Sequence, residues 1–146
     1  MGIPAFGPDG RLPPGEHLAT WDDLEKRLRF STRRRDLVRG LLRGLLDLRG
    51  AGCRRVFVDG SFATATRNPN DIDVAWDPTG VDPALLDPTF FQFDNRRAAQ
   101  KAKWGCEFFP SIAAAAPGGI TYVEFFKSVH DPPEKGILVV ELGSLP

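Results

Sequence analysis

The sequence predicts an α/β (α+β) fold, a mixed β-sheet with helices packed on it, and three observations lead to that prediction. Residues from about 33 to 49 repeat Leu and Val at three- and four-residue spacing, which gives a helix one apolar face. Two short segments rich in β-forming residues, 54–59 and 71–76, follow this helix. Along the chain the segments run α, β, β, α, β, α, β, an order typical of a sheet covered by helices. A length of 146 residues with 42% apolar residues supplies one ordinary core.

The N-terminal part is predicted to begin with an irregular arm and to continue into two helices. Residues 1–18 contain four prolines and four glycines, so the compact domain is expected to span 19–146. Thr20, which two acids follow closely, caps a short helix that ends near Phe30. Ser31 or Thr32 then caps the longer helix, and two glycines end it.

The rest of the chain supplies the sheet and the remaining helices. Residues 54–59 form a strand that runs into the turn Gly60-Ser61, and 71–76 alternate acidic and apolar residues, the pattern of a half-buried strand. After them we expect a Pro- and Asp-rich stretch with one short helix at 77–89, a polar helix at 95–103 and a third strand at 104–109. The segment 121–128 is ambiguous but favours a helix, and 136–142 is expected to form the last strand.

Composition and charge narrow the class of protein. The apolar runs are shorter than the roughly 20 residues of a bilayer span, and the N-terminus lacks the pattern of a signal peptide, so we expect a soluble, cytoplasmic protein with no membrane contact. Cys53 and Cys106 are too few for a disulfide framework or a metal cluster. Residues 1–57 carry 12 Lys and Arg against 7 Asp and Glu, a charge of +5, and 58–146 carry −5. A polyanion-binding face beside a metal site produces this asymmetry, and so does a solvated basic helix.

The segment that carries chemistry joins the Gly60-Ser61 turn to two acids, Asp71 and Asp73. Carboxylates at i and i+2 of a strand point to one face, where they repel each other unless a cation lies between them. Carboxylate oxygens without nearby His or Cys suit magnesium better than zinc. A Gly-Ser turn between a parallel-type strand and a helix can cradle phosphate, because glycine allows close approach and the helix N-terminus adds its dipole. Either feature alone is common; together, in this order, they indicate nucleotidyl or phosphoryl transfer with two metal ions.

This segment resembles the DNA polymerase β-like nucleotidyltransferase superfamily, whose signature is an apolar run, Gly-Ser or Gly-Gly, about nine to thirteen residues, then Asp-apolar-Asp/Glu-apolar. The match is complete at Gly60-Ser61 and at 71–74, and it is close only over 56–76. The resemblance implies that Gly60 and Ser61 bind the β- and γ-phosphates of a nucleoside triphosphate (NTP) and that Asp71 and Asp73 coordinate two Mg²⁺ ions. Leu12-Pro13-Pro14-Gly15 and Pro69-x-Asp71-Ile72-Asp73 are also similar to a family of small, uncharacterised bacterial proteins with a predicted nucleotidyltransferase fold.

The resemblance also implies a third catalytic and metal-binding acid from a later strand. Glu107 is the candidate, because it lies inside a short apolar strand and an unpaired acid is costly to bury there. The superfamily more often has Asp at this place. Glu124 and Glu141 are rivals, and an acid at the strand edge that faces water is the alternative.

Several basic residues are candidates for contacts with NTP or an acceptor. Arg67, between the turn and the acids, can donate two hydrogen bonds to a triphosphate, and Lys135 precedes the last strand as a second candidate for the nucleotide. Lys101 and Lys103 on the polar helix are weaker candidates. Arg33-Arg34-Arg35 opens the long helix and can contact an RNA or phosphate backbone. For each of them a solvated side chain is the alternative.

Two functions of different classes follow. The first is a minimal magnesium-dependent nucleotidyltransferase with Asp71, Asp73 and Glu107 as catalytic residues, which transfers NMP from NTP to a hydroxyl of RNA, such as a tRNA end, or of a protein. Small members of the superfamily are often half of a toxin–antitoxin or defence module, so a cognate toxin or antitoxin is a candidate partner. The second is a catalytically weak or inactive nucleotide-binding or protein-interaction module with the same fold. A structural α/β domain with a chance motif is a third, lesser interpretation.

Overall fold

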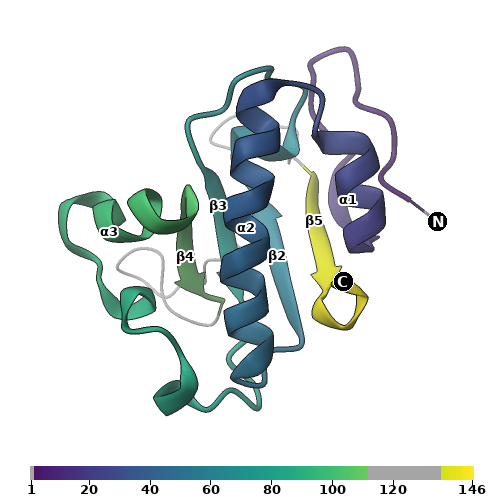
Figure 1. Ribbon diagram of the computed structural model, residues 1–146. Helices are drawn as coiled ribbons and strands as arrows, with labels where there is room; N and C mark the ends of the chain where they lie inside the picture. Colours follow the sequence, from purple (N-terminus) through teal and green to yellow (C-terminus); the bar gives the residue numbers. More distant parts are fainter. Residues whose placement is uncertain (1, 112–135) are drawn as a thin grey trace, which may run out of the picture.

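The computed structural model describes residues 2–111 and 136–146, and within them a sheet of five strands packs against α-helices in an α+β arrangement (Figure 1). The strands are β1 (Gly15–Ala19), β2 (Arg55–Asp59), β3 (Ile72–Trp76), β4 (Cys106–Pro110) and β5 (Gly136–Glu141). The helices are α1 (Trp21–Leu28), α2 (Thr32–Gly50) and α3 (Asp94–Trp104). The expected helix at 121–128 lies outside the described residues.

The sheet is mixed, as expected, with the strand order β1-β5-β2-β3-β4. β1 runs parallel to β5 and β3 runs parallel to β4, whereas β2 is antiparallel to both of its neighbours. The prediction of a parallel-type strand before the Gly-Ser turn was therefore wrong. The chain between β2 and β3 contains a three-residue 3-10 turn, η1 (Ser61–Ala63), and no α-helix that could carry it back across the sheet as a parallel connection requires.

The expected arm is irregular only as far as Pro14. Residues Gly15–Ala19 form β1, an edge strand whose partner β5 lies about 120 residues later in the chain. Five residues after two prolines carry little β signal of their own, so the strand depends on pairing with an apolar neighbour that local sequence does not reveal.

The first two helices begin where their capping residues predict. Thr20 and Asp23 form a capping box at the start of α1, with each side chain bound to the other residue's backbone N–H. The Ser31 hydroxyl accepts from the backbone N–H of Arg34 at the start of α2. Their apolar faces, with Trp104 of α3, pack on one face of the sheet and form the main core with side chains such as Val56, Val58 and Val74. α2 lies along that face and α3 lies beside the edge strand β4 (Figure 1).

The segment between β3 and α3 differs from the single short helix that we expected. It contains two 3-10 turns, η2 (Pro83–Leu85) and η3 (Pro88–Phe91), each begun by an aspartate cap and a proline. In the first turn of α3, Asn95, Arg96 and Arg97 have φ values of 52°, 56° and 58°, in the left-handed region. Non-glycine residues rarely adopt this conformation, and it persists where surrounding contacts enforce it.

Among the described residues, no helix has the length and apolar character that crossing a membrane requires.

Candidate active site

Four acids lie together on the sheet face opposite α2, and we call them the acidic cluster: Asp59, Asp71, Asp73 and Glu107. Asp59 of β2 pairs in register with Asp73 of β3, and Asp73 pairs in register with Glu107 of β4. Asp71 precedes Asp73 by two residues and so points to the same face. Their neighbours along the strands point the other way, into the main core. The cluster therefore draws on three adjacent strands.

The structure brings three of the predicted site residues together and adds one that the sequence analysis missed. Glu107, not Glu141, shares the face of the two aspartates: Glu141 is exposed at the end of β5, in register with Arg55. Glu124 lies outside the described residues. Asp59 is buried at the end of an apolar strand, and its place directly before Gly60 is the one local signal that marks it.

The cluster concentrates negative charge in a partly buried place. The pKa of Asp73 is raised to about 7, first by burial and then by the charges of Asp71 and Glu107. The pKa of Asp71 is also raised, by burial and by Glu107. A hydrogen bond with Glu107 adds to the shift at Asp73. The site therefore favours either a shared proton or a bound cation.

Lys101 of α3 supplies a cation to this cluster. Its Nζ lies 2.8 Å from Oε1 of Glu107 and 3.8 Å from Oδ2 of Asp71. The hydrogen bond with Glu107 is the main reason that the pKa of Lys101 is raised. Lys101 was predicted only as a weak candidate for a nucleotide contact; in the structure it is the counter-ion of the acids.

The donor chemistry of the cluster fits Mg²⁺, because all its ligand atoms are carboxylate oxygens. As the side chains lie, however, no group of three or more His, Cys, Asp or Glu residues within 2–111 and 136–146 has the arrangement of a metal site. The Lys101 ammonium lies between two of the acids, Asp71 and Glu107. A metal ion would have to share the cluster with Lys101 or displace it.

Gly60 is required by the geometry of the turn next to these acids. Its φ is 76°, and a Cβ added there would lie 2.5 Å from Oδ2 of Asp73. Ser61 follows with an exposed side chain. The prediction of a helix after the turn was wrong, because η1 has three residues and is too short to contribute a helix dipole. Two features of the expected phosphate site are still present: the space that glycine leaves open and the Ser61 hydroxyl.

The loop from Ser61 to Asn70 is held by the start of α2. Arg34 is fully buried and donates hydrogen bonds to five backbone carbonyl oxygens, four of them in this loop: Leu28, Ser61, Phe62, Thr64 and Thr66. Its guanidinium also stacks on Phe62, 4.9 Å from the ring centroid. Burial lowers its pKa to about 10, which still leaves it charged at neutral pH.

The idea that the arginine triplet contacts RNA is therefore wrong for Arg34, whose hydrogen-bonding groups face inward. Arg33 donates to the carbonyl oxygens of Pro69 and Asn70, just before Asp71. Arg35 is exposed. Two of the three arginines thus position the connection between the Gly-Ser turn and the first acid, a role that no local pattern shows.

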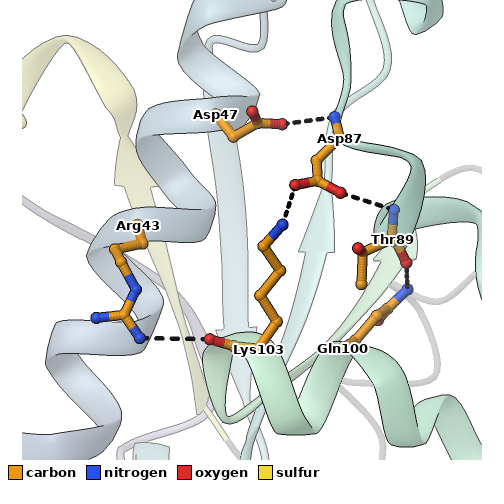
Figure 2. A network of polar contacts seen from close by, with 6 residues as sticks. All are labelled: Arg43, Asp47, Asp87, Thr89, Gln100 and Lys103. Atoms are coloured by element: carbon orange, nitrogen blue, oxygen red, sulfur yellow. Dashed lines mark hydrogen bonds and ion pairs between the residues drawn. The ribbon is translucent and has the colours of Figure 1, made fainter.

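A second polar network fixes α3 and hence Lys101 (Figure 2). Lys103 and the backbone N–H of Thr89 both bind the Asp87 carboxylate, and Asp47 of α2 accepts from the backbone N–H of Asp87. Gln100 is fully buried; its Nε2 donates to the carbonyl oxygens of Thr89 and Phe90, and its Oε1 accepts from the Phe108 N–H at 2.7 Å. The predicted nucleotide contact of Lys103 gives way to this structural ion pair.

The two remaining predicted contacts have different outcomes. Arg67 is exposed, and its backbone carbonyl accepts from the Ser31 hydroxyl at 2.6 Å, so its guanidinium extends from an anchored backbone. Lys135 lies outside the described residues. Arg97, which the sequence analysis passed over, stacks on Phe109 of β4 with its guanidinium carbon 4.0 Å from the ring centroid.

Comparison with known proteins places the chain in a family without assigning an activity. A family model matches residues 4–141, most of the chain, and that family is described as a family of unknown function (DUF6932). No curated protein and no solved structure matches the chain.

Proposed function

The chain belongs to this family of unknown function, DUF6932, and from the chemistry of its acidic cluster we propose that it is a magnesium-dependent nucleotidyltransferase. It would transfer NMP from an NTP to a hydroxyl of RNA or of a protein. The observation that carries the proposal is the set of Asp71, Asp73 and Glu107 on one sheet face, beside the Gly60-Ser61 turn. The raised pKa values of the two aspartates support it, because a cation is what lets these carboxylates ionise together.

In this proposal each residue has a defined task. Asp71, Asp73 and Glu107 hold Mg²⁺, which when bound supplies positive charge and a Lewis acid at the phosphates. Gly60 keeps the space beside Asp73 free of a side chain, and the Ser61 hydroxyl donates a hydrogen bond to a phosphate oxygen. The acceptor oxygen bonds to the α-phosphorus, the bond from that phosphorus to pyrophosphate breaks, and the hydroxyl proton passes to Glu107.

The test is transfer of label from each α-labelled NTP to total RNA or to cell protein in the presence of Mg²⁺. We expect label on one acceptor class with the wild-type chain and loss of at least about a hundredfold in rate for Asp73→Asn, because the interaction is needed in the transition state. Asp36→Asn is the matched control: Asp36 makes an exposed ion pair with Arg39, away from the cluster. Full transfer by the Asp73 variant would refute this mechanism.

The acceptor class is part of the same proposal. A tRNA end or another RNA would carry the label if RNA is the acceptor, and a cognate toxin or antitoxin would carry it if the chain belongs to a two-component module. Separation of the labelled products by size and by sensitivity to ribonuclease or protease distinguishes these partners.

A second candidate function is a nucleotide-binding or protein-interaction module without catalysis. The observation that favours it is Lys101, whose ammonium already neutralises Glu107 and Asp71 and so lowers the need for a metal ion. Calorimetry with NTP, with and without Mg²⁺, separates the two functions. Binding that does not depend on Mg²⁺, with no labelled acceptor, favours the module.

A further inference from the structure

A cation and two aromatic rings form a stack at the edge of the sheet, and we call it the Arg97 stack: Phe93, Arg97 and Phe109. The Arg97 guanidinium carbon lies 4.0 Å from the Phe109 ring centroid and 4.8 Å from that of Phe93. Arg97 Nε also donates to the Phe108 carbonyl oxygen at 3.1 Å, which fixes the plane of the guanidinium. Phe109 is buried, whereas Phe93 is 47% exposed. The stack thus ends in a ring that is open to solvent.

The stack lies alongside the acidic cluster. Phe109 follows Glu107 by two residues on β4, so both side chains are on the face opposite α2, about 7 Å apart along the strand. On α3, Arg97 precedes Lys101 by four residues and is the last of the three residues with a left-handed φ. Arg97 contacts Phe109 and Lys101 contacts Glu107. A molecule with a phosphate chain at the acids can therefore reach the stack.

The charge beside the stack suits an anionic group of a ligand. Of the four cations in residues 93–104, Lys101 and Lys103 are paired with Glu107 and Asp87, which leaves Arg97 in the stack and the exposed Arg96 next to it. An exposed aromatic ring supported by a planar guanidinium offers π-stacking and cation–π attraction to a flat heterocycle. Bases of single-stranded nucleic acids and free nucleotides bind on such platforms, next to cations that attract the backbone.

We infer that the exposed ring of Phe93, supported by Arg97, binds a nucleobase by stacking. The inference rests on the proposed function for the place of the phosphates, but stacking itself needs neither transfer nor magnesium. The base belongs either to the NTP or to an unpaired nucleotide of single-stranded RNA. Both sources present the same chemistry to Phe93, and the ligands of the experiment separate them.

The experiment measures dissociation constants for wild type, Phe93→Ala and Phe93→Trp. The ligands are the four NTPs, tripolyphosphate (which has no base) and an eight-nucleotide single-stranded RNA. Loss of the ring is expected to weaken binding of at least one base-bearing ligand about 5- to 150-fold, the usual effect of removing one stacking aromatic residue. Affinity for tripolyphosphate is expected to stay the same, and Phe93→Trp is expected to restore the affinity for bases.

Phe91→Ala is the matched control, because Phe91 has the same exposed fraction, 47%, and lies two residues away on η3. Thermal unfolding confirms that each variant is folded. Equal affinities of wild type and Phe93→Ala for every base-bearing ligand, or binding of none of them by wild type, overturns the inference. Base-dependent binding with no transfer to any acceptor contradicts only the proposed catalysis.

Discussion

Replacement of Arg34 by methionine tests the account of how the site is held together. The substitution keeps an apolar stem of similar length and removes hydrogen bonds to five carbonyl oxygens, at distances of 2.6 to 3.4 Å. A buried acceptor left without a donor costs about 1–3 kcal/mol. These costs do not simply add, because the variant also avoids burying a charge and the loop can turn some carbonyls to water. We expect a loss of about 3–5 kcal/mol in the free energy of unfolding.

For a chain of 146 residues, that loss corresponds to a fall of roughly 10–16 °C in the midpoint of thermal unfolding. Circular dichroism during heating or urea titration measures it. Arg35→Met is the control, because Arg35 is the exposed neighbour on the same helix; its effect should stay within about 0.5 kcal/mol. A loss below about 1 kcal/mol for Arg34→Met would show that the loop does not depend on this arginine, and the positioning argument would fail.

Three further changes probe the cluster itself. Gly60→Ala should destabilise the protein by at least about 1–2 kcal/mol, because alanine is strained at φ 76° and its Cβ would clash with Asp73. Gly143→Ala is the control, because nothing lies within 4 Å of a Cβ added there. Equal midpoints of urea unfolding for the two variants would contradict this geometry. Lys101→Met should bind Mn²⁺ about tenfold more tightly by calorimetry, because the Lys101 ammonium contacts Glu107 and Asp71, two of the carboxylates that would hold the ion, and two like unit charges about 4 Å apart repel by roughly 1–4 kcal/mol. Unchanged or weaker binding would exclude this competition. The pKa of Asp73 is raised to about 7, so the folded protein keeps a proton that the unfolded chain loses above its ordinary value of 3.8. In EDTA, the free energy of unfolding should therefore fall as pH rises from about 4 to 7, by at most about 1.4 kcal/mol per pH unit. Asp73→Asn should flatten this dependence on pH. If the variant keeps the same dependence, the effect belongs to other groups.

Local signals in the sequence predicted most of the elements. Thr20 and Ser31 cap the first two helices because a capping side chain binds backbone groups only two or three residues away. The alternation at 71–76 predicted both the strand β3 and the common face of Asp71 and Asp73. Glu107 was selected differently: the resemblance implied a third acid from a later strand, and an acid inside a short apolar strand is costly to bury without a partner.

The features that the sequence analysis missed depend on contacts between distant segments. Arg34 looks like its two neighbours in the sequence, and only the folded loop brings carbonyl oxygens around it. Lys101 became the counter-ion of the acids because the buried Gln100 and the ion pair of Lys103 fix the helix that carries it. Hydrophobic periodicity contains no information about such long-range polar contacts.

The parallel pairing of β1 with β5 gives the proline-rich N-terminal segment a protective task. β5 has four consecutive apolar residues, 137–140, and β1 covers the side of it that β2 leaves unpaired. A chain shortened to begin after Ala19 would keep every acid of the cluster and yet present β5 as a bare sheet margin, a template onto which other chains can add. Without β1, that free margin of β5 would favour aggregation.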